Sequence, residues 1–446
     1  MESKGPALAR ALGVVEASSI VVGTVIGTGI FLKPRVIASY LDSPELILAI
    51  WVVGGVLSLL GALSYAELGA MFPEAGGEYI FMREIYGRPW GFLWAWTYFA
   101  CAKIGSIAAL GAGFSIYLRA FVPLPGFLAT LAALVAIAAV TGVNVAGVAV
   151  GGRLQAWLTL LKIGSLFAIM GLAFSAPSGS WAHLAAAPAS EPRHGLAGAV
   201  GLALVAVLWA YDGWNDLVMV SGEIKDPQRN VFRSLFWGMA VIVVLYLGAN
   251  LAYHYAIPVA EMRHAERVAE AAVSGVLGSR GAAVVSGIIL VSILGALNGS
   301  ILSGARIPYA AAADGVFPAP LARVHPVRLT PVVSLVAQGL LACGLILVFT
   351  ALGIGQFDAI TDMVIFAEWA FYGMCAAGVI VLRRRRPDLP RPYRAWGYPW
   401  AQALFVACAA WLFVNSLLEA PKQSGIGLLL ILLGIPAYWL SRPKQA

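Results

Sequence analysis

The chain of 446 residues is 60% hydrophobic and only 11% charged, with a mean hydropathy of +0.85. This composition excludes a water-soluble globular domain of this size and indicates an all-α polytopic membrane protein. The formal net charge of +7 calls for no nucleic-acid partner, because basic loops at a membrane surface account for it.

The apolar stretches predict twelve transmembrane helices in a single domain that spans residues 1–446. Their expected ranges are 13–37, 46–70, 90–118, 126–144, 154–175, 197–221, 234–256, 280–304, 331–352, 358–382, 399–418 and 424–441. An even number of crossings places both termini on one side, and that side carries most of the Lys and Arg residues, including the run Arg383 to Arg386. The positive-inside rule therefore predicts a multi-pass protein of the cell inner (cytoplasmic) membrane with both termini in the cytoplasm.

The first predicted helix contains a weak point, the tract Gly27-Thr28-Gly29 within the apolar run from Val14 to Leu32. Glycines weaken the helical hydrogen bonds where lipid cannot replace them. Such a backbone persists when it is buried in protein or lines a site, where its N–H groups can bind an anion such as a carboxylate. Close packing of helices through small residues is the alternative explanation for this segment alone.

A second break is predicted in the sixth helix, whose centre reads Trp209-Ala-Tyr-Asp-Gly-Trp-Asn-Asp216. Carboxylates at this depth are costly and usually face a cavity, although Asp212 and Asp216 could instead only cap a helix break. The two breaks lie five helices apart, so the second unit of five would insert upside down. This pattern predicts the midplane site of a secondary transporter, with inverted repeats over 13–175 and 197–382 and two additional helices over 399–441. A site with helix N-termini for an anion and free carbonyls for a cation suits an α-amino acid.

Several motifs together resemble the amino acid–polyamine–organocation (APC) transporter superfamily, in its L-amino-acid transporter branch and of prokaryotic type. The resemblance covers nearly the whole chain. The motifs are Gly23 to Phe31 with Pro34, Glu67 to Pro73 followed by Gly76 to Tyr79, Ala210 to Asn215, Glu223 to Asn230, and Asn298 to Ser300.

The resemblance implies a five-plus-five inverted repeat (LeuT-like) with discontinuous helices 1 and 6, and transport of free amino acids by alternating access. It implies that the N–H groups of Gly27, Thr28 and Gly29 bind the substrate carboxylate. The carbonyls of Val25, Ile26 and Trp209 would accept from its ammonium group, and Trp209 would also form an outer gate. Ala210 and Asp212 would complete the substrate-binding set.

Two lysines lie inside predicted helices, Lys103 in the third and Lys162 in the fifth. A lone lysine is costly in a bilayer, and Lys162 lies too far inside its helix to reach the interface. By resemblance, Lys162 fills the place where related transporters hold sodium, and links the first break to small residues of the eighth helix, namely Ser292, Gly295, Gly299 and Ser303. Lys103 would either pair with Asp212 or help to select the substrate side chain, with Asp212 meeting a cationic one.

These features predict sodium-independent exchange of L-amino acids, neutral ones first and cationic ones as a further class. A proton-coupled amino acid symporter stays open, because burial would allow Lys162 to titrate, as does a membrane sensor of amino acids that does not transport. Glu368 in the tenth helix is either a further titrating group or a partnered structural carboxylate. A channel would need a symmetric pore motif, which two unequal breaks do not provide. The five scattered histidines give no catalytic cluster, so we expect no enzyme activity, no metal and no cofactor.

The expected partners are the amino acid substrate and the lipid bilayer. Eukaryotic members of the branch join a heavy subunit through a cysteine between the third and fourth helices. This chain has no cysteine in the corresponding segment, Arg119 to Gly126, and its four cysteines all fall inside predicted helices. We therefore expect no disulfide-linked heavy subunit.

Overall fold

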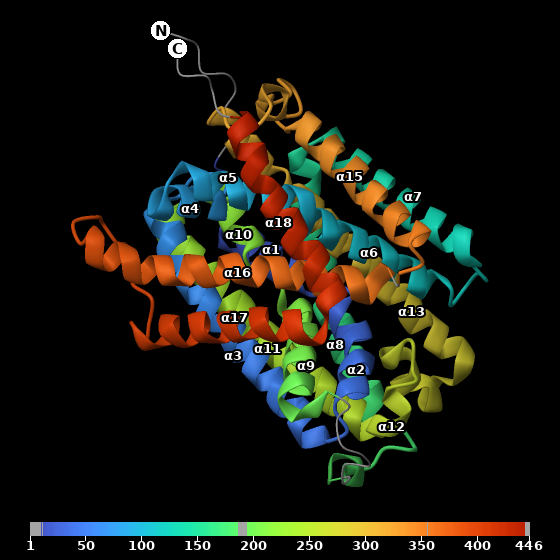
Figure 1. Ribbon diagram of the computed structural model, residues 1–446. Coiled ribbons are helices and arrows are strands. Elements are labelled where there is room, and N and C mark those ends of the chain that lie inside the picture. Colours follow the sequence, from blue (N-terminus) through green and yellow to red (C-terminus); the bar gives the residue numbers. More distant parts are fainter. Residues whose placement is uncertain (1–9, 11, 186–193, 355, 442–446) are drawn as a thin grey trace.

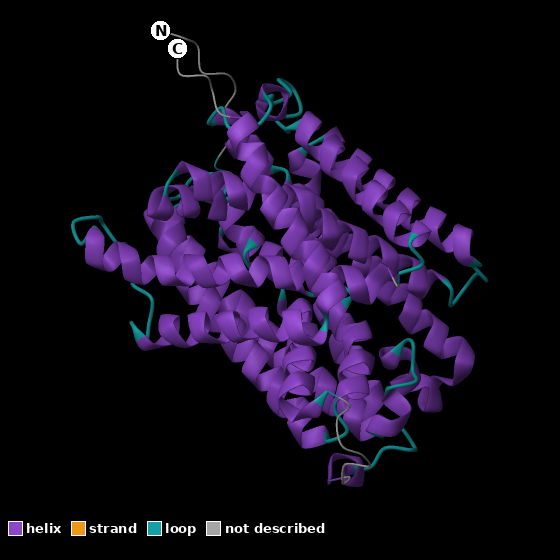
Figure 2. Ribbon diagram, viewed as in Figure 1, coloured by secondary structure: helices purple, strands orange, loops and turns teal. Residues whose placement is uncertain are grey.

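The computed structural model describes residue 10 and residues 12–185, 194–354 and 356–441, and most of these lie in helices (Figure 2). The helices are α1 (Val14–Val25), α2 (Gly29–Tyr40), α3 (Pro44–Met71), α4 (Glu78–Tyr86), α5 (Arg88–Thr97), α6 (Lys103–Leu118), α7 (Gly126–Ala146), α8 (Val148–Phe174), α9 (Gly195–Tyr211), α10 (Asp216–Met219), α11 (Pro227–Ala256), α12 (Val259–Met262), α13 (Val268–Gly304), α14 (Arg306–Ala313), α15 (Val332–Ala351), α16 (Gln356–Arg385), α17 (Trp400–Glu419) and α18 (Pro421–Ser441). A π-helical turn at Tyr98–Ala102 joins α5 to α6, and short 3-10 turns lie at Trp181–Ala185, Ser221–Glu223 and Ala319–Ala322.

Eleven segments of the described chain are long and apolar enough to cross a membrane, and they correspond to eleven of the predicted ranges. The seventh predicted helix begins earlier, at Pro227, and the eighth extends further, to Ala313. The predicted sixth crossing, 197–221, is instead the shorter helix α9 of 17 residues, followed by a break and then by α10. Helix α9 ends at Tyr211, because the Asp212 N–H bonds to the Trp209 carbonyl three residues back instead of four. The chain is therefore a multi-pass membrane protein, and the count of twelve crossings stays a prediction.

The two interrupted helix pairs lie in the interior of the bundle (Figure 1). Helix α1 packs against α8, α11 and α13, and α2 packs against α9. Helices α7 and α15 pack on one flank, and α16, α17 and α18 pack on another. Most residues of α9 are buried, whereas α18 is largely exposed, so the broken helices form the core and the last helices its outer layer.

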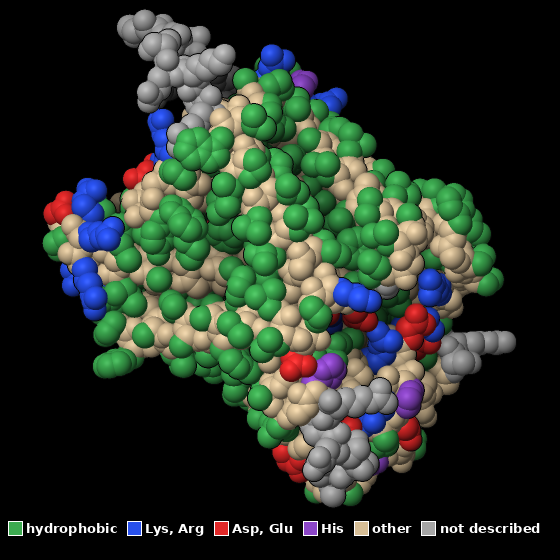
Figure 3. Space-filling view, viewed as in Figure 1, with side chains coloured by type: hydrophobic (Ala, Val, Ile, Leu, Met, Phe, Trp, Pro, Cys, Tyr) green, Lys and Arg blue, Asp and Glu red, His purple; other side chains and the backbone are tan. Residues whose placement is uncertain are grey.

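On the face shown in Figure 3, the outer surface is apolar between two charged edges. Large exposed hydrophobic side chains include Trp157 and Leu160 of α8, Leu340 of α15 and Leu440 of α18. Because a bilayer core offers no hydrogen bonds, an apolar belt of this kind is the surface that lipid requires. The belt leaves the polar groups of the interior to be satisfied by one another.

Candidate functional site

The first break separates α1, which ends at Val25, from α2, which begins at Gly29. The N–H of Gly27 turns back to the Val25 carbonyl at 2.7 Å instead of continuing the helix. The first N–H groups of α2 have no acceptor within their own helix, as at any helix start, and they carry partial positive charge. The break predicted at Gly27 to Gly29 is therefore present, and its free donors suit an anion.

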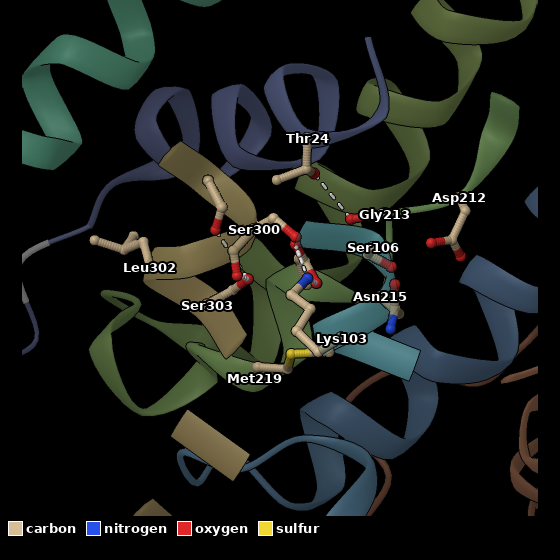
Figure 4. A network of polar contacts seen from close by, with 12 residues as sticks. Thr24, Lys103, Ser106, Asp212, Gly213, Asn215, Met219, Ser300, Leu302 and Ser303 are labelled. Carbon is tan, nitrogen blue, oxygen red and sulfur yellow. Dashed lines mark hydrogen bonds and ion pairs between the residues drawn. The ribbon is translucent and has the colours of Figure 1, made fainter. Parts of the chain in front are cut away.

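The second break separates α9, which ends at Tyr211, from α10, which begins at Asp216. Gly213 lies between them with a φ of 108°, a conformation that glycine adopts readily. Its carbonyl accepts a hydrogen bond from the Thr24 hydroxyl at 2.9 Å, so the two breaks are joined directly (Figure 4). The backbones also touch, since a Cβ atom placed on Gly29 would lie 2.4 Å from the Cα of Ala210.

Both breaks border one cavity of about 30 Å³. It is lined by Thr24, Val25, Gly27, Thr28, Gly29, Lys103, Ser106, Leu110, Trp209, Asp212, Gly213, Asp216 and Ser300. This volume suits a water molecule and is too small for an amino acid. A larger ligand therefore requires the residues that line the cavity to move.

The cavity brings together most of the residues predicted to bind substrate, but not all of them. Val25, Gly27, Thr28, Gly29, Trp209, Asp212 and Lys103 line it, whereas Ile26 and Ala210 do not. The Ile26 carbonyl accepts instead from the Lys162 ammonium at 2.9 Å, and Ala210 packs on Gly29. The Val25 carbonyl accepts from the Tyr246 hydroxyl at 2.8 Å, and the Trp209 carbonyl from the Asp212 N–H at 3.2 Å. The expected ammonium acceptors thus already have protein donors, and their role toward substrate stays a prediction.

Lys162 is 1% exposed and holds the end of α1. Its ammonium donates to the carbonyls of Gly23 at 2.7 Å and Ile26 at 2.9 Å. On the α13 side it lies against Gly295, where an added Cβ would be 2.9 Å from the lysine Cε. The Ser292 hydroxyl donates to the Ile26 carbonyl at 3.4 Å rather than meeting the lysine. The predicted link to the eighth helix is therefore a packing contact, and both hydrogen bonds go to α1.

Lys103 pairs with Asp216. It does not pair with Asp212, the partner that the sequence analysis considered. Its Nζ lies 2.6 and 2.8 Å from the two carboxylate oxygens of Asp216, and both side chains are buried. Asp212 stands apart from the lysine (Figure 4) and accepts from the Tyr372 hydroxyl at 3.1 Å. The two aspartates are a helical turn apart in sequence, so the sequence alone could not select between them.

Polar contacts close the bundle on either side of the cavity. Toward the termini, the Arg306 guanidinium pairs with Glu223 at 3.1 Å, and both side chains are buried. On the opposite side, the buried Lys33 ammonium donates to Thr361 at 2.7 Å and to Asp358 at 3.3 Å. These pairs join residues far apart in sequence, and sequence reasoning did not find them.

An aromatic contact adds to the closure on the side away from the termini. The rings of Trp209 and Phe357 meet edge to face with centroids 6.3 Å apart. Because Trp209 also lines the cavity, the tryptophan is the residue between the cavity and this closure. A position between the cavity and the outer contact is the one that an outer gate would occupy, and the gating role of Trp209 stays a prediction.

Comparison with known proteins gives one family and several relatives. The family model described as amino acid permease matches residues 12–439. The serine/threonine exchanger SteT of Bacillus subtilis is 30% identical over 450 residues, which cover 100% of both chains. The large neutral amino acids transporter small subunit 2 of Mus musculus is 33% identical over 99% of this chain and 83% of its own length. The b(0,+)-type amino acid transporter 1 of Mus musculus is 33% identical over 88% of this chain and 80% of its own.

Proposed function

The chain belongs to the amino acid permease family, and from this premise we propose that it exchanges free L-amino acids across the membrane by alternating access. Neutral amino acids are its first substrates and cationic ones a further class. The observation that carries this function is the meeting of two broken helices at one cavity. Relatives named as amino acid exchangers or transporters support it.

The substrate carboxylate binds at the start of α2. The N–H groups of Thr28 and Gly29 face no acceptor in their own helix, and the helix dipole adds positive potential there. The substrate ammonium binds near the end of α1 and the end of α9, where Val25 and Trp209 line the cavity. Backbone recognition of this kind reads the α-amino acid group and leaves the side chain to the rest of the cavity.

Lys162 makes sodium unnecessary. Its ammonium places a fixed positive charge on the carbonyls of Gly23 and Ile26, which are hard oxygen ligands of the kind that a bound metal cation would use. The lysine therefore holds the first break in shape without a coupling ion, and transport requires an amino acid on each side rather than an ion gradient.

Alternating access uses the two closures described above. Opening the Glu223–Arg306 side exposes the cavity toward the termini, and opening the Lys33–Asp358 side exposes it to the opposite face. The structure has both contacts formed, and the cavity is too small for substrate. The broken helices supply the hinges, because short unwound segments absorb backbone rotation.

Further parts of the proposal concern the whole chain. We propose that 13–175 and 197–382 are inverted repeats followed by two additional helices over 399–441, and that the termini face the cytoplasm of a cell with the protein in its inner membrane. The charged run Arg383 to Arg386 at the end of α16 supports this orientation. The four cysteines lie in helices and none lies in the segment Arg119 to Gly126 between α6 and α7, which supports a chain without a disulfide-linked heavy subunit.

The test is uptake of labelled amino acids by proteoliposomes in sodium-free medium. Vesicles are preloaded either with unlabelled amino acids or with buffer alone. Uptake that needs the preloaded amino acid supports a sodium-independent exchanger, and competition by unlabelled solutes identifies its substrates. Uptake that appears only with a sodium or proton gradient would refute the exchange mechanism, and no uptake under any condition would favour a sensor.

A further inference from the structure

Four carboxyl groups meet next to the cavity in the interior of the bundle. Asp212 and Asp216 come from the second break, Glu78 from α4 and Glu368 from α16. Glu78 is 0% exposed, Asp216 1% and Glu368 2%, whereas Asp212 reaches the cavity. Each of Asp212, Glu78 and Glu368 interacts electrostatically with Asp216 and with Lys103.

Hydrogen bonds reach Asp212, Asp216 and Glu78 from separate donors, and two carboxyl oxygens of the group have no partner in the described structure. The Tyr372 hydroxyl donates to Asp212 at 3.1 Å, and Glu368 precedes Tyr372 by one turn of α16. The Asn215 amide donates to one oxygen of Glu78 at 2.8 Å. The second oxygen of Glu78 and one oxygen of Glu368 are buried and have no hydrogen-bond partner in the described structure.

The charges of this group do not balance if every carboxyl group is ionised. Lys103 is the positive charge that acts on it, and Asp216 already pairs with that lysine at 2.6 Å. Glu78, which lies outside the membrane-spanning helices, holds its own proton at neutral pH, because burial raises its pKa to about 8. Asp212 and Glu368 remain, without a cation of their own. Glu368 is buried and Asp212 is only partly exposed, at the cavity, so ionising both would leave two negative charges at this depth without a cation, and they keep a proton between them.

We propose that Asp212 and Glu368 share a proton whenever no cationic substrate is bound, and that a cationic amino acid side chain displaces this proton into water as it binds. The ammonium or guanidinium group of the side chain then supplies the missing positive charge at Asp212, which borders the cavity. A neutral side chain leaves the proton in place. This inference rests on the proposed function, and it adds a proton to the exchange of a cationic for a neutral amino acid.

The other groups that face Glu368 do not supply the charge. They are Tyr65 of α3, Tyr98 and Cys101 of the π-helical turn, and Tyr372 of its own helix, in addition to the carboxyl groups and Lys103 named above. The phenols and the thiol are neutral at physiological pH. The proton that a cationic substrate displaces is therefore held by Asp212 and Glu368.

The test measures inhibition of labelled alanine exchange by unlabelled lysine and by unlabelled alanine in proteoliposomes, between pH 5.5 and 8.5 with equal pH on both sides and the membrane potential clamped at zero. If one proton competes with lysine, the half-inhibitory lysine concentration falls by up to about tenfold per pH unit as pH rises, by reciprocal linkage. The value for alanine, which serves as the internal reference, changes little. In Glu368→Gln the half-inhibitory concentrations of lysine and alanine should change with pH in parallel. The control Glu270→Gln, a carboxylate paired with Arg267 outside this group, should keep the parental pH dependence.

The outcomes separate the two proposals. Parallel lysine and alanine curves in the parent protein, or an unchanged lysine curve in Glu368→Gln, would overturn the shared proton while leaving exchange intact. Absence of exchange for every amino acid would refute the proposed function instead. In that case, or if Glu368→Gln is inactive, the shared proton is tested by the melting temperature of the purified protein with and without lysine. A stabilisation by lysine that grows from pH 6 to pH 8 in the parent supports the proposal, and one that is equal at both overturns it.

Discussion

At the scale of single residues, Lys162 has the most defined task, since its two hydrogen bonds go to carbonyls on either side of the last turn of α1. Lys162→Ala would leave the carbonyls of Gly23 and Ile26 without this donor in a buried place, at a cost of about 1–3 kcal/mol per unsatisfied group. We expect exchange to fall by at least about tenfold, because that cost distorts the break that binds substrate. The measurement is the initial rate in preloaded proteoliposomes.

The matched control for Lys162 is Lys225→Ala, which removes an exposed lysine from a loop and should keep the parental rate. Reduced uptake in Lys162→Ala that is restored by sodium would show that the lysine replaces a cation. A parental rate in Lys162→Ala would remove this residue from the mechanism.

Glu78 makes the stability of the protein depend on pH. Its pKa is raised by burial from 4.5 to about 8, so between these values the folded chain keeps a proton that the unfolded chain has lost. Stability therefore falls as pH rises through this window. Glu78→Gln keeps an acceptor for the Asn215 amide but cannot ionise, so its melting temperature should decline less than that of the parent between pH 5 and 8. Parallel melting curves for the two proteins across this range would contradict the prediction.

At the scale of helices, the contact between α2 and α9 depends on the absence of a side chain at residue 29. A Cβ on Gly29 would lie 2.4 Å from the Ala210 Cα, so Gly29→Ala must push the two broken helices apart. Overpacking of this kind costs about 1–3 kcal/mol. We expect a lower melting temperature and a loss of most exchange activity. Gly164→Ala, where a Cβ meets nothing within 4 Å, is the control, and equal behaviour of the two variants would refute the argument.

The sequence was most informative about the helices and least about their partners. The breaks at Gly27 to Gly29 and at Asp212 to Asn215 were predictable, because glycine and buried carboxylates are unfavourable in an uninterrupted membrane helix. The pairing of Lys103 with Asp216 was not, since Asp212 and Asp216 differ only in which way the unwound segment turns. Helical periodicity does not describe an unwound segment, so its side-chain directions require the structure.

At the scale of the whole molecule, the structure is closed on both sides of the cavity by contacts that join opposite parts of the chain. Lys33 and Asp358 are 325 residues apart, and Arg306 and Glu223 are 83 apart. No local sequence pattern connects such residues, which is why composition and motifs predicted the class and the breaks but not the closures. A transporter needs both closures to be weak enough to open in turn. The relative stability of the two closures therefore decides to which side of the membrane the cavity opens.

Weakening one closure should shift this balance toward opening on that side. Lys33→Met removes the buried ammonium that meets Asp358 and Thr361, while keeping a side chain of similar length. We expect the cavity to open more often to the side opposite the termini, since removing about 1–2 kcal/mol from one closure changes a two-state population by about five- to thirtyfold.

Ser106, which lines the cavity, serves as the reporter after Ser106→Cys in a chain whose four native cysteines are replaced. Labelling by a membrane-impermeant thiol reagent, added from the side opposite the termini, should be faster with Lys33→Met than without it. The exposed Lys422→Met is the control. Equal labelling rates in the three proteins would show that the Lys33 contacts do not control access to the cavity.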